Sequence, residues 1–493
     1  MALSDSAERG LLTGIKAAEA APRHDAHMSS HPVPVFDADL IARYDVVGPR
    51  YTSYPTAPEF DARFGEAEYR AAARASNEDP IPRRLSIYVH VPFCFSPCFY
   101  CGCARIITRD RSKAEAYLAR LHREIELTAP MFDRDRQVVQ LHFGGGTPNF
   151  LDGRQMAELV ESMSRQFTFA HDSAREFGIE LDPRSADARY VAMLAEHGFN
   201  RLSVGVQDFD ADVQAAVNRI QSVEETRAVI DAAREHGFRS TSIDLIYGLP
   251  RQTPASFART LEQVIAIRPD RIATYGYAHL PARFKAQRQI DAVELPDAAE
   301  RLALLGLTIR TLTDAGYRYI GMDHFALPGD ELSRAQEHGT LQRNFQGYST
   351  HGSCDMIGLG MTSIGRIGDA YMQNAKDLVG YYAALDAGRL PVARGMILDE
   401  DDRIRADAIQ RIMCDGVIEI APFEARHQID FADYFAHELN RLRTLAEDGL
   451  VVLSPTRIAA TARGRLLLRI IAMCFDAYLS RPHEIAPGYS KAL

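Results

Sequence analysis

Four cysteines lie close together, and three of them have a spacing that suits an iron–sulfur cluster. Cys94, Cys98 and Cys101 form the pattern C-x₃-C-x₂-C, and Cys103 follows two residues later. A [4Fe–4S] cluster is usually held by four thiolates. If only three bind, one iron keeps an open position that could chelate the amino and carboxylate groups of a methionine moiety. The loop therefore predicts a cluster on Cys94, Cys98 and Cys101 that reduces and cleaves S-adenosylmethionine (SAM).

Two other uses of clustered cysteines fit this spacing less well. A zinc ribbon takes its ligands from two C-x₂-C pairs that are well apart in the sequence, whereas these cysteines share one loop. A reactive dithiol pair has a different spacing. The remaining cysteines are scattered and are interpreted as small buried hydrophobic residues: Cys354, Cys414 and Cys474.

A second group of candidate residues consists of glycines and polar side chains near the ends of expected strands. Gly145 and Gly146 precede Thr147 in GGGTP, where the absence of side chains would let backbone groups approach a ligand. Glu180 could accept bonds from an ammonium group, Arg219 could fork onto a carboxylate, and Asp244 could bind ribose hydroxyls. Taken alone, the glycines fit a tight turn equally well, and the residue types favour a surface ion pair for Glu180 and Arg219 and a helix cap for Asp244.

Alternating strand and helix patterns must position these residues. Apolar runs predict strands over 85–91, 138–143, 178–181, 201–206, 240–246 and 271–277, and 316–322 adds a possible edge strand. Helical patterns lie between them over 113–127, 155–167, 223–236 and 256–267. Strands alternating with helices imply a parallel sheet, and the cysteine loop would then lie at the carboxyl end of the first strand.

The expected fold is α/β, a partial (β/α)₆ barrel followed by a mainly helical C-terminal domain. Residues 1–35 are interpreted as a mobile tail, 36–375 as the catalytic barrel and 376–493 as the helical domain. The clearest C-terminal helical patterns cover 403–418 and 464–479, and the acidic stretch 399–402 is a plausible start for that domain.

The composition narrows the function classes. The chain has 493 residues, a formal net charge of −10 and 46% hydrophobic residues, which is typical of a globular protein with two or three domains. The charge argues against non-specific nucleic-acid binding. Because we find neither a long apolar run nor a signal peptide, we expect no membrane span and a cytoplasmic location.

Longer motifs narrow the interpretation to one family. They are PRYTSYPT (49–56), the segment 88–103, GGGTP (144–148), ELDPR (180–184), GFNRLSVGVQDF (198–209), IDLIYGLP (243–250), YAHLP (277–281), YIGMDHFA (319–326) and RNFQGY (343–348). Together, over roughly residues 40–480, they resemble oxygen-independent coproporphyrinogen III oxidases of the radical SAM superfamily. This family converts coproporphyrinogen III to protoporphyrinogen IX in haem biosynthesis.

The resemblance implies the chemistry and the cofactors. A 5′-deoxyadenosyl radical abstracts hydrogen from a propionate β-carbon, and loss of CO₂ and one electron then leaves a vinyl group. Two propionates react, and two SAM molecules bind beside the [4Fe–4S] cluster. We expect a monomer that takes electrons from a flavodoxin-like or ferredoxin-like donor.

The resemblance also assigns site residues. Cofactor contacts are expected from Tyr88, Tyr100, Gly145, Gly146, Thr147, Glu180, Gln207, Arg219, Asp244, Ala278 and Ile364. Tyr88 and Cys103 are expected to be catalytic, with Cys103 on the substrate side of the site. Relatives that handle haem typically carry phenylalanine at this position, so Cys103 favours the oxidase over a haem-trafficking protein. A radical SAM methyltransferase and an anaerobic haem-opening enzyme are further alternatives, disfavoured by PRYTSYPT, Cys103 and GVQDF.

Several basic residues remain open. The four carboxylates of the substrate require basic partners, because burying them unpaired is costly. Arg50, Arg105 and Arg109 flank the motifs and are candidates. His90, His142 and His324 lie in apolar runs and are interpreted as satisfied core histidines, while 50–54 is expected to cover the barrel mouth and shield a radical from water.

Overall fold

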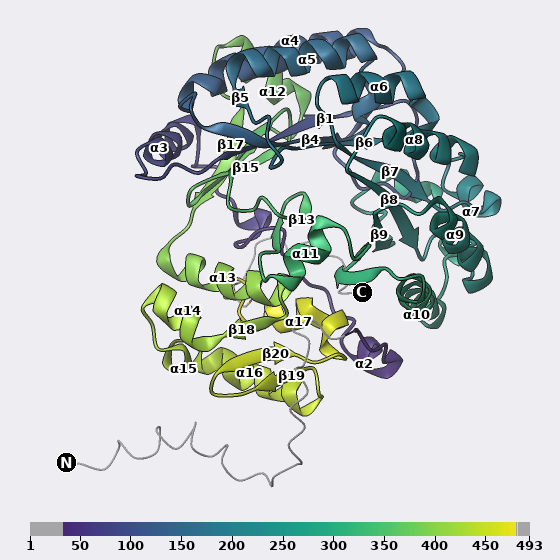
Figure 1. The fold of residues 1–493 in the computed structure, drawn as a ribbon, viewed down its shortest axis with the longest axis vertical. Helices are drawn as coiled ribbons and strands as arrows, with labels where there is room; N and C mark the ends of the chain where they lie inside the picture. Colours follow the sequence, from purple (N-terminus) through teal and green to yellow (C-terminus); the bar gives the residue numbers. More distant parts are fainter. Residues whose placement is uncertain (1–32, 480, 482–493) are drawn as a thin grey trace.

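The main feature of the fold is one large, mostly parallel sheet wrapped by helices (Figure 1). The structure is a computed structural model that describes residues 33–479 and 481. Its strand order is β10-β11-β9-β8-β7-β6-β4-β1-β14-β15-β16-β17, with the short β5 paired to β4. The two ends of this order do not pair with each other, so the sheet is a partial barrel.

The six predicted barrel strands are present and parallel. They are β1 (Leu85–Val91), β4 (Gln137–Gly145), β6 (Glu176–Leu181), β7 (Arg201–Gln207), β8 (Ser240–Tyr247) and β9 (Arg271–Gly276). Each pairs in parallel with its neighbour in this series. Their carboxyl ends therefore meet at one edge, which is where the cysteine loop begins.

Helices between the strands cover the outer face of the sheet (Figure 1). They are α4 (Ser112–Thr128), α5 (Gly153–Gln166), α6 (Ala188–Glu196), α7 (Ala211–Ala216), α8 (Val223–Glu235), α9 (Pro254–Ile267) and α10 (Ala298–Asp314). Local sequence fixes several of their starts. Asp152 and Gln155 form a capping box at the start of α5, and Ser222 and Glu225 form another at the start of α8. These side chains accept hydrogen bonds from first-turn N–H groups, which have no partner within the helix.

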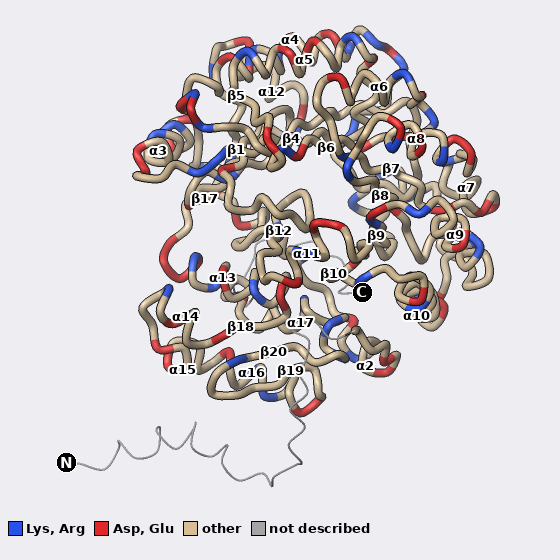
Figure 2. Tube along the Cα trace, viewed as in Figure 1, with Lys and Arg blue, Asp and Glu red and all other residues tan. Residues whose placement is uncertain are grey.

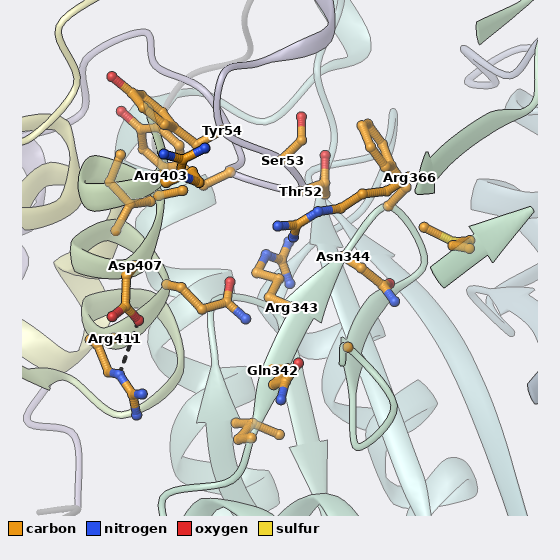
Figure 3. A pocket seen from close by; sticks show the side chains of 18 of the residues that line it. Thr52, Ser53, Tyr54, Gln342, Arg343, Asn344, Arg366, Arg403, Asp407 and Arg411 are labelled. Carbon is orange, nitrogen blue, oxygen red and sulfur yellow. Dashed lines mark hydrogen bonds and ion pairs between the residues drawn. The ribbon is translucent and has the colours of Figure 1, made fainter. Parts of the chain in front are cut away.

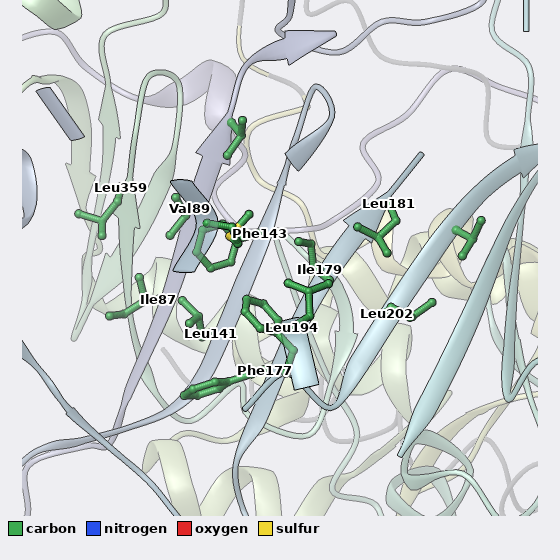
Figure 4. Packing of buried hydrophobic residues seen from close by; sticks show 14 of the residues in the cluster. Ile87, Val89, Leu141, Phe143, Phe177, Ile179, Leu181, Leu194, Leu202 and Leu359 are labelled. Atoms are coloured by element: carbon green, nitrogen blue, oxygen red, sulfur yellow. The ribbon is translucent and has the colours of Figure 1, made fainter. Parts of the chain in front are cut away.

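The core lies between the sheet and these helices (Figure 4). Ile87 and Val89 of β1 pack with Leu141 and Phe143 of β4, and all four side chains are fully buried. Burial of one such side chain stabilises a fold by about 1.5–3 kcal/mol. The apolar runs that predicted these strands are thus the inner lining of the core.

The sheet continues on both sides beyond the six predicted strands. On one side are β14 (Asp355–Leu359), parallel to β1, and the antiparallel β15 (Ile364–Ile367), β16 (Ala370–Asn374) and β17 (Val392–Ile397). On the other side, β10 (Arg318–Gly321) forms the expected edge strand next to β11 (His324–Ala326). β17 lies beyond residue 376, where the sequence placed the end of the barrel.

Shorter elements fill the space around the sheet. They are α2 (Ala38–Arg43), α3 (Glu66–Asn77), β2 (Phe93–Cys94), β3 (Ile106–Ile107), β5 (Thr168–Phe169), α11 (Glu331–Glu337), the hairpin β12 (Gln342–Asn344) and β13 (Gly347–Ser349), and α12 (Leu378–Asp386). The hairpin lies between the sheet and the C-terminal helices (Figure 1).

The C-terminal region is mainly helical, as expected, with a small sheet inserted. Its helices are α13 (Glu400–Cys414), α14 (Ile420–His427), α15 (Phe431–Tyr434), α16 (Ala436–Glu447) and α17 (Leu468–Met473). The strand order of the sheet is β18 (Val417–Glu419), β20 (Arg457–Ala460), β19 (Val451–Leu453). A second core fills this region and includes Leu40, Tyr51 and Tyr54 from the start of the chain.

Two predicted C-terminal helices were too long. Helix α13 ends at Cys414 because Gly416 adopts a positive φ of 70°, and 417–419 then pairs as a strand. The single helix expected over 464–479 is instead a 3₁₀ turn (Gly464–Leu467) followed by α17. There the buried Arg465 side chain donates to the carbonyls of Asp415 and Ile320, contacts that no helical periodicity reveals.

The predicted mobile tail, 1–35, lies outside the described residues except for 33–35. Charged residues of both signs are interspersed over the outer helices (Figure 2). In the part of the chain that the structure describes, no helix combines the length and the apolar character needed to cross a membrane.

Candidate active site at the carboxyl end of the first strand

The cysteine loop begins directly after β1, as predicted, and is fixed at several points. Cys94 ends the short strand β2, which pairs with β3. The Arg105 guanidinium donates to the backbone carbonyls of Cys98 at 3.1 Å and Cys101 at 2.9 Å. Phe99 N donates to Val217 O at 2.9 Å, which ties the loop to the end of α7. The loop is therefore held by backbone contacts before any ligand binds.

Each of the three expected cluster ligands has a donor beside its sulfur. Thr147 Oγ1 lies 3.4 Å from Cys94 Sγ, and Arg219 Nη1 lies 3.6 Å from Cys98 Sγ. The backbone N–H of Cys103 donates to Cys101 Sγ at 3.4 Å. Hydrogen bonds to sulfur favour the thiolate form that iron requires. This donor set fits an iron–sulfur cluster.

The thiol pKa values differ within the loop. Burial raises the pKa of Cys94 to about 11. The hydrogen bond from Cys103 and the nearby charge of Arg105 lower the pKa of Cys101 to about 6. In the described residues, no three His, Cys, Asp or Glu side chains already converge as they would around one metal ion. A four-iron cluster differs in this respect, because each thiolate binds a different iron.

The glycine loop after β4 lies against the cysteine loop. Gly145 has a φ of +118°, and a Cβ there would lie 2.8 Å from the His90 ring and 2.9 Å from Val91 O. A Cβ on Gly146 would lie 2.7 Å from the carbonyl of Pro92. The glycines thus permit close contact between the ends of β4 and β1, and the carbonyl contact explains why a side chain is excluded.

Arg219 is buried at the base of the cysteine loop. Besides Cys98, its guanidinium donates to Gly205 O at 2.5 Å and lies 3.4 Å from Asp182. Arg184 forks onto the same Asp182 carboxylate at 2.6 Å. The surface ion pair considered from sequence is wrong, because Arg219 is 7% exposed and bridges two barrel strands to the loop.

Glu180 and Asp244 share a cavity inside the barrel. His142, Tyr275 and His324 also line it. Burial and the neighbouring Glu180 charge raise the pKa of Asp244 to about 7, while a hydrogen bond from Ser203 at 3.0 Å opposes the rise. Asp244 sits within β8, so the helix-cap alternative is also wrong.

Tyr88 and its neighbours form one wall of this barrel interior. The Tyr88 hydroxyl lies 3.1 Å from His90 Nδ1, and the Tyr88 and His142 rings stack at 6.1 Å. Burial raises the pKa of Tyr88 well above its usual range, so the phenol keeps its proton. His142 Nε2 lies 3.4 Å from Glu180.

The other expected contacts lie around the barrel mouth. Gln287 Nε2 donates to Tyr100 O at 2.8 Å and to Ala278 O at 3.1 Å, so one amide positions both predicted residues. Gln207 ends β7 with a positive φ of 71°. Ile364 begins β15 and packs against a separate small cluster formed by Phe60, Tyr371 and Leu398.

The histidines and the candidate arginines have different outcomes. His90 is a satisfied core histidine, because its Nε2 lies 3.0 Å from Ala104 O. His324 is half-buried, and its buried Nδ1 has no hydrogen-bond partner in the described residues. Arg50 forms an ion pair with Asp323 and lies 5.6 Å from the Tyr275 ring centre.

Neither Arg105 nor Arg109 is among the residues that line the cavity with Glu180 and Asp244. Arg105 is used by the cysteine loop, as described above, and Arg109 is exposed. Sequence reasoning missed Asp182 and Gln287 as positioning residues. Asp182 lies in the quoted ELDPR motif, which was the available signal, whereas nothing in the sequence points to Gln287.

A cysteine loop of this spacing at the carboxyl end of β1 in a parallel partial barrel defines a radical SAM enzyme, and residues 88–264 match the Radical SAM superfamily. Residues 398–467 match the HemN C-terminal domain. An oxygen-independent coproporphyrinogen III oxidase of Pseudomonas aeruginosa is 51% identical over 444 residues, which cover 90% of this chain and 96% of the relative. The chain belongs to the family of oxygen-independent coproporphyrinogen III oxidases.

Two Escherichia coli comparisons agree with this assignment. The oxygen-independent coproporphyrinogen III oxidase of strain K12 is 49% identical, with the same shares of both chains covered. The solved structure described as "Coproporphyrinogen III oxidase (HemN) from Escherichia coli is a Radical SAM enzyme" superposes with a TM-score of 0.86 at 47% identity. It covers 91% of this chain and 100% of that chain.

Proposed function

We propose that the chain catalyses the oxygen-independent oxidative decarboxylation of coproporphyrinogen III to protoporphyrinogen IX in haem biosynthesis. The observation that carries the proposal is the 51% sequence identity to the Pseudomonas aeruginosa oxidase, over 96% of the length of that relative. Each of two propionates would lose a β-hydrogen atom, CO₂ and one electron to become a vinyl group. Cys103 disfavours a haem-trafficking role, because relatives that handle haem typically carry phenylalanine at this position.

Cys94, Cys98 and Cys101 would hold the [4Fe–4S] cluster that this superfamily uses with SAM. When bound, these cofactors supply the 5′-deoxyadenosyl radical that abstracts the hydrogen atom. The chain's own part is to orient the thiolates. Thr147 and Arg219 donate to two of the sulfurs, and both donors are buried, which fixes the geometry without reorganisation.

The number of SAM molecules, two, is part of the proposal. Their contacts would come from Tyr88, Tyr100, Gly145, Gly146, Thr147, Glu180, Gln207, Arg219, Asp244, Ala278 and Ile364. Glu180 and Asp244 support this because they are acceptors in one cavity beside the glycine loop. Ala278 follows β9 and Ile364 begins β15, two strands near opposite ends of the sheet order, so they would contact different parts of the ligands.

Cys103 and Tyr88 are the proposed catalytic residues. Cys103 is exposed at the end of the cysteine loop and is near enough to Glu180 to feel its charge, which supports a place on the substrate side. The Tyr88 phenol keeps its proton and donates it to His90 Nδ1 at 3.1 Å, because His90 Nε2 donates to the carbonyl of Ala104. Arg50, fixed by Asp323 beside Tyr275, supports the idea that 50–54 excludes water from the mouth.

Further parts of the proposal concern domains, partners and location. The main sheet continues through Ile397, which favours a boundary near residue 398 over the one expected at 376. A single chain would be the active form and would receive electrons from a flavodoxin-like or ferredoxin-like donor in the cytoplasm.

The test is anaerobic reconstitution with iron and sulfide, followed by incubation with SAM, a strong reductant and coproporphyrinogen III. We expect a brown protein that forms protoporphyrinogen IX, and Cys101→Ala should abolish both colour and product. A brown protein that cleaves SAM yet leaves coproporphyrinogen unchanged would refute the proposed substrate while retaining the radical chemistry.

A further inference from the structure

A large cavity lies beside the barrel, between the hairpin β12–β13, helix α13 and the segment 51–54 (Figure 3). Its volume is about 570 Å³, within the range of about 300–1,000 Å³ that is typical of small-molecule sites. None of the cofactor contacts proposed above lines it. Its lining is rich in arginine, which favours an anionic ligand.

The carboxylates that line this cavity are already paired with arginines. Each forms an ion pair with a basic side chain of the same lining: Asp369 with Arg403 at 3.0 Å, Asp407 with Arg426 at 3.0 Å, and Asp415 with Arg411 at 3.4 Å. They therefore add little negative charge to the cavity.

Two arginines of the lining are different. Arg343 is 7% exposed, its Nη1 has no hydrogen-bond partner, and no carboxylate lies within ion-pair distance in the part of the chain that the structure describes. Its other contacts are the carbonyl of Arg50 at 3.3 Å and the ring of Tyr348 at 4.7 Å. Arg366 likewise donates only to a carbonyl, that of Gly368, among the described residues.

These two guanidinium groups point toward one another below Thr52 and Ser53 (Figure 3). Two like charges in a partly buried site repel each other, and a buried guanidinium without a counter-charge is unfavourable. An anion between them would remove both penalties. Because guanidinium presents a planar fork of donors, a carboxylate is the anion that fits its geometry.

The cavity also borders the barrel interior. Tyr348, under the Arg343 guanidinium, lines the cavity that holds Glu180 and Asp244. Ser86 of the arginine-lined cavity bonds Gln140 of the barrel interior at 2.8 Å. One ligand with several carboxylates on its rim could thus reach both spaces.

We propose that Arg343 and Arg366 bind the propionates of the tetrapyrrole that do not react, and so position the reacting propionate toward the barrel interior. This inference rests on the proposed function and names the subsite that selects the substrate. Coproporphyrinogen III carries four propionates, of which two are lost, so the two retained groups offer constant anchors through both decarboxylations.

The first measurement is binding of mesoporphyrin IX, a stable porphyrin with only two propionates, to the reconstituted full-length protein. We expect Arg343→Met and Arg366→Met each to weaken binding about 10–100-fold, the loss typical of one charge-assisted contact. Arg343→Lys and Arg366→Lys should restore part of it. The dimethyl ester, which lacks both carboxylates, should bind the wild type more weakly than the free acid binds either methionine variant.

Arg403→Met is the matched control, because it lines the same cavity but is ion-paired with Asp369. It should leave mesoporphyrin affinity within about twofold. Circular dichroism and iron content check that Arg343→Met is folded, and the half-buried Arg366 offers a second site with less risk to the fold.

Turnover separates this inference from the proposed function. With coproporphyrinogen III, both variants should raise KM more than they lower kcat, and they should leave substrate-free SAM cleavage unchanged. Equal mesoporphyrin affinity of wild type and both methionine variants would overturn the carboxylate site even if turnover is present. Mesoporphyrin binding that depends on both arginines, in a protein that never decarboxylates coproporphyrinogen, would retain the site and refute the reaction.

Discussion

Replacing Glu124 by glutamine should remove a pH-dependent loss of stability that originates beneath the loop leading to Ile364. Glu124 lies on α4, is 1% exposed, and accepts hydrogen bonds from Gly360 N at 2.7 Å, Asn374 Nδ2 at 2.6 Å and Tyr381 Oη at 2.5 Å. Burial raises its pKa from 4.5 to about 7, although these three bonds favour the charged form. Glutamine keeps the size of the side chain and removes the titration.

The sign and the magnitude follow from the pKa difference. Below pH 4.5 the carboxyl is protonated in both the folded and the unfolded chain. As pH rises toward 7, the unfolded chain ionises first, so unfolding becomes easier. Since one pKa unit corresponds to about 1.4 kcal/mol, the full effect is roughly 3 kcal/mol, of which about 2 kcal/mol falls between pH 5 and pH 7.5.

The assay is urea unfolding at pH 5 and pH 7.5, followed by circular dichroism and by tyrosine fluorescence, because the chain contains no tryptophan. From pH 5 to pH 7.5, the free energy of unfolding of the wild type should fall by about 2 kcal/mol relative to Glu124→Gln. Glu115→Gln, an exposed change on the same helix, should follow the wild type. Parallel pH profiles for wild type and Glu124→Gln would refute the reasoning.

Three further predictions concern the site. Arg219→Lys should lower the iron and sulfide bound per chain several-fold, because lysine lacks the fork of donors that bonds Gly205 and Asp182 together. The control Arg234→Lys, at an exposed position, should bind as much iron as the wild type. Equal iron content of Arg219→Lys and the wild type would contradict this reasoning. Gly146→Ala should destabilise the protein by about 1–3 kcal/mol through its backbone contact, measured as the urea midpoint of the apoprotein, and an unchanged midpoint would contradict the close approach. SAM affinity of the reconstituted wild type should rise from pH 6 to pH 8 as the carboxyl of Asp244 ionises, and Asp244→Asn should be weak and independent of pH; a wild-type affinity that does not change would exclude this carboxylate as an acceptor.

The barrel strands could be predicted because each is an apolar run between turn residues. The predicted strand over 85–91 coincides with β1. Both faces of this strand are buried, so its sequence is a nearly continuous apolar run. The antiparallel strands β15 to β17 escaped prediction because they are short and mix polar with apolar residues. Their pairing depends on neighbours far away in the sequence, which local periodicity does not encode.

The kind of site could be predicted from the sequence, but the contacts between its residues could not. Spacing alone placed Cys94, Cys98 and Cys101 on one loop. It could not show that Arg219 would reach Cys98 across 121 residues, or that Arg343 would be buried without a counter-charge. Such contacts follow from the tertiary fold. For the same reason, removing residues 1–56 would disturb the C-terminal core, because Tyr51 and Tyr54 belong to it.

The packing of Tyr51 against the end of the chain has a consequence for synthesis on the ribosome. Its hydroxyl donates to Asp476 at 2.9 Å, a contact that spans 425 residues. This contact can form only after residue 476 has been synthesised, whereas the cysteine loop and the six barrel strands, which end at Gly276, are available earlier. Until residue 476 has been made, Tyr51 lacks this partner, and 50–54 cannot take the position that it has in the structure.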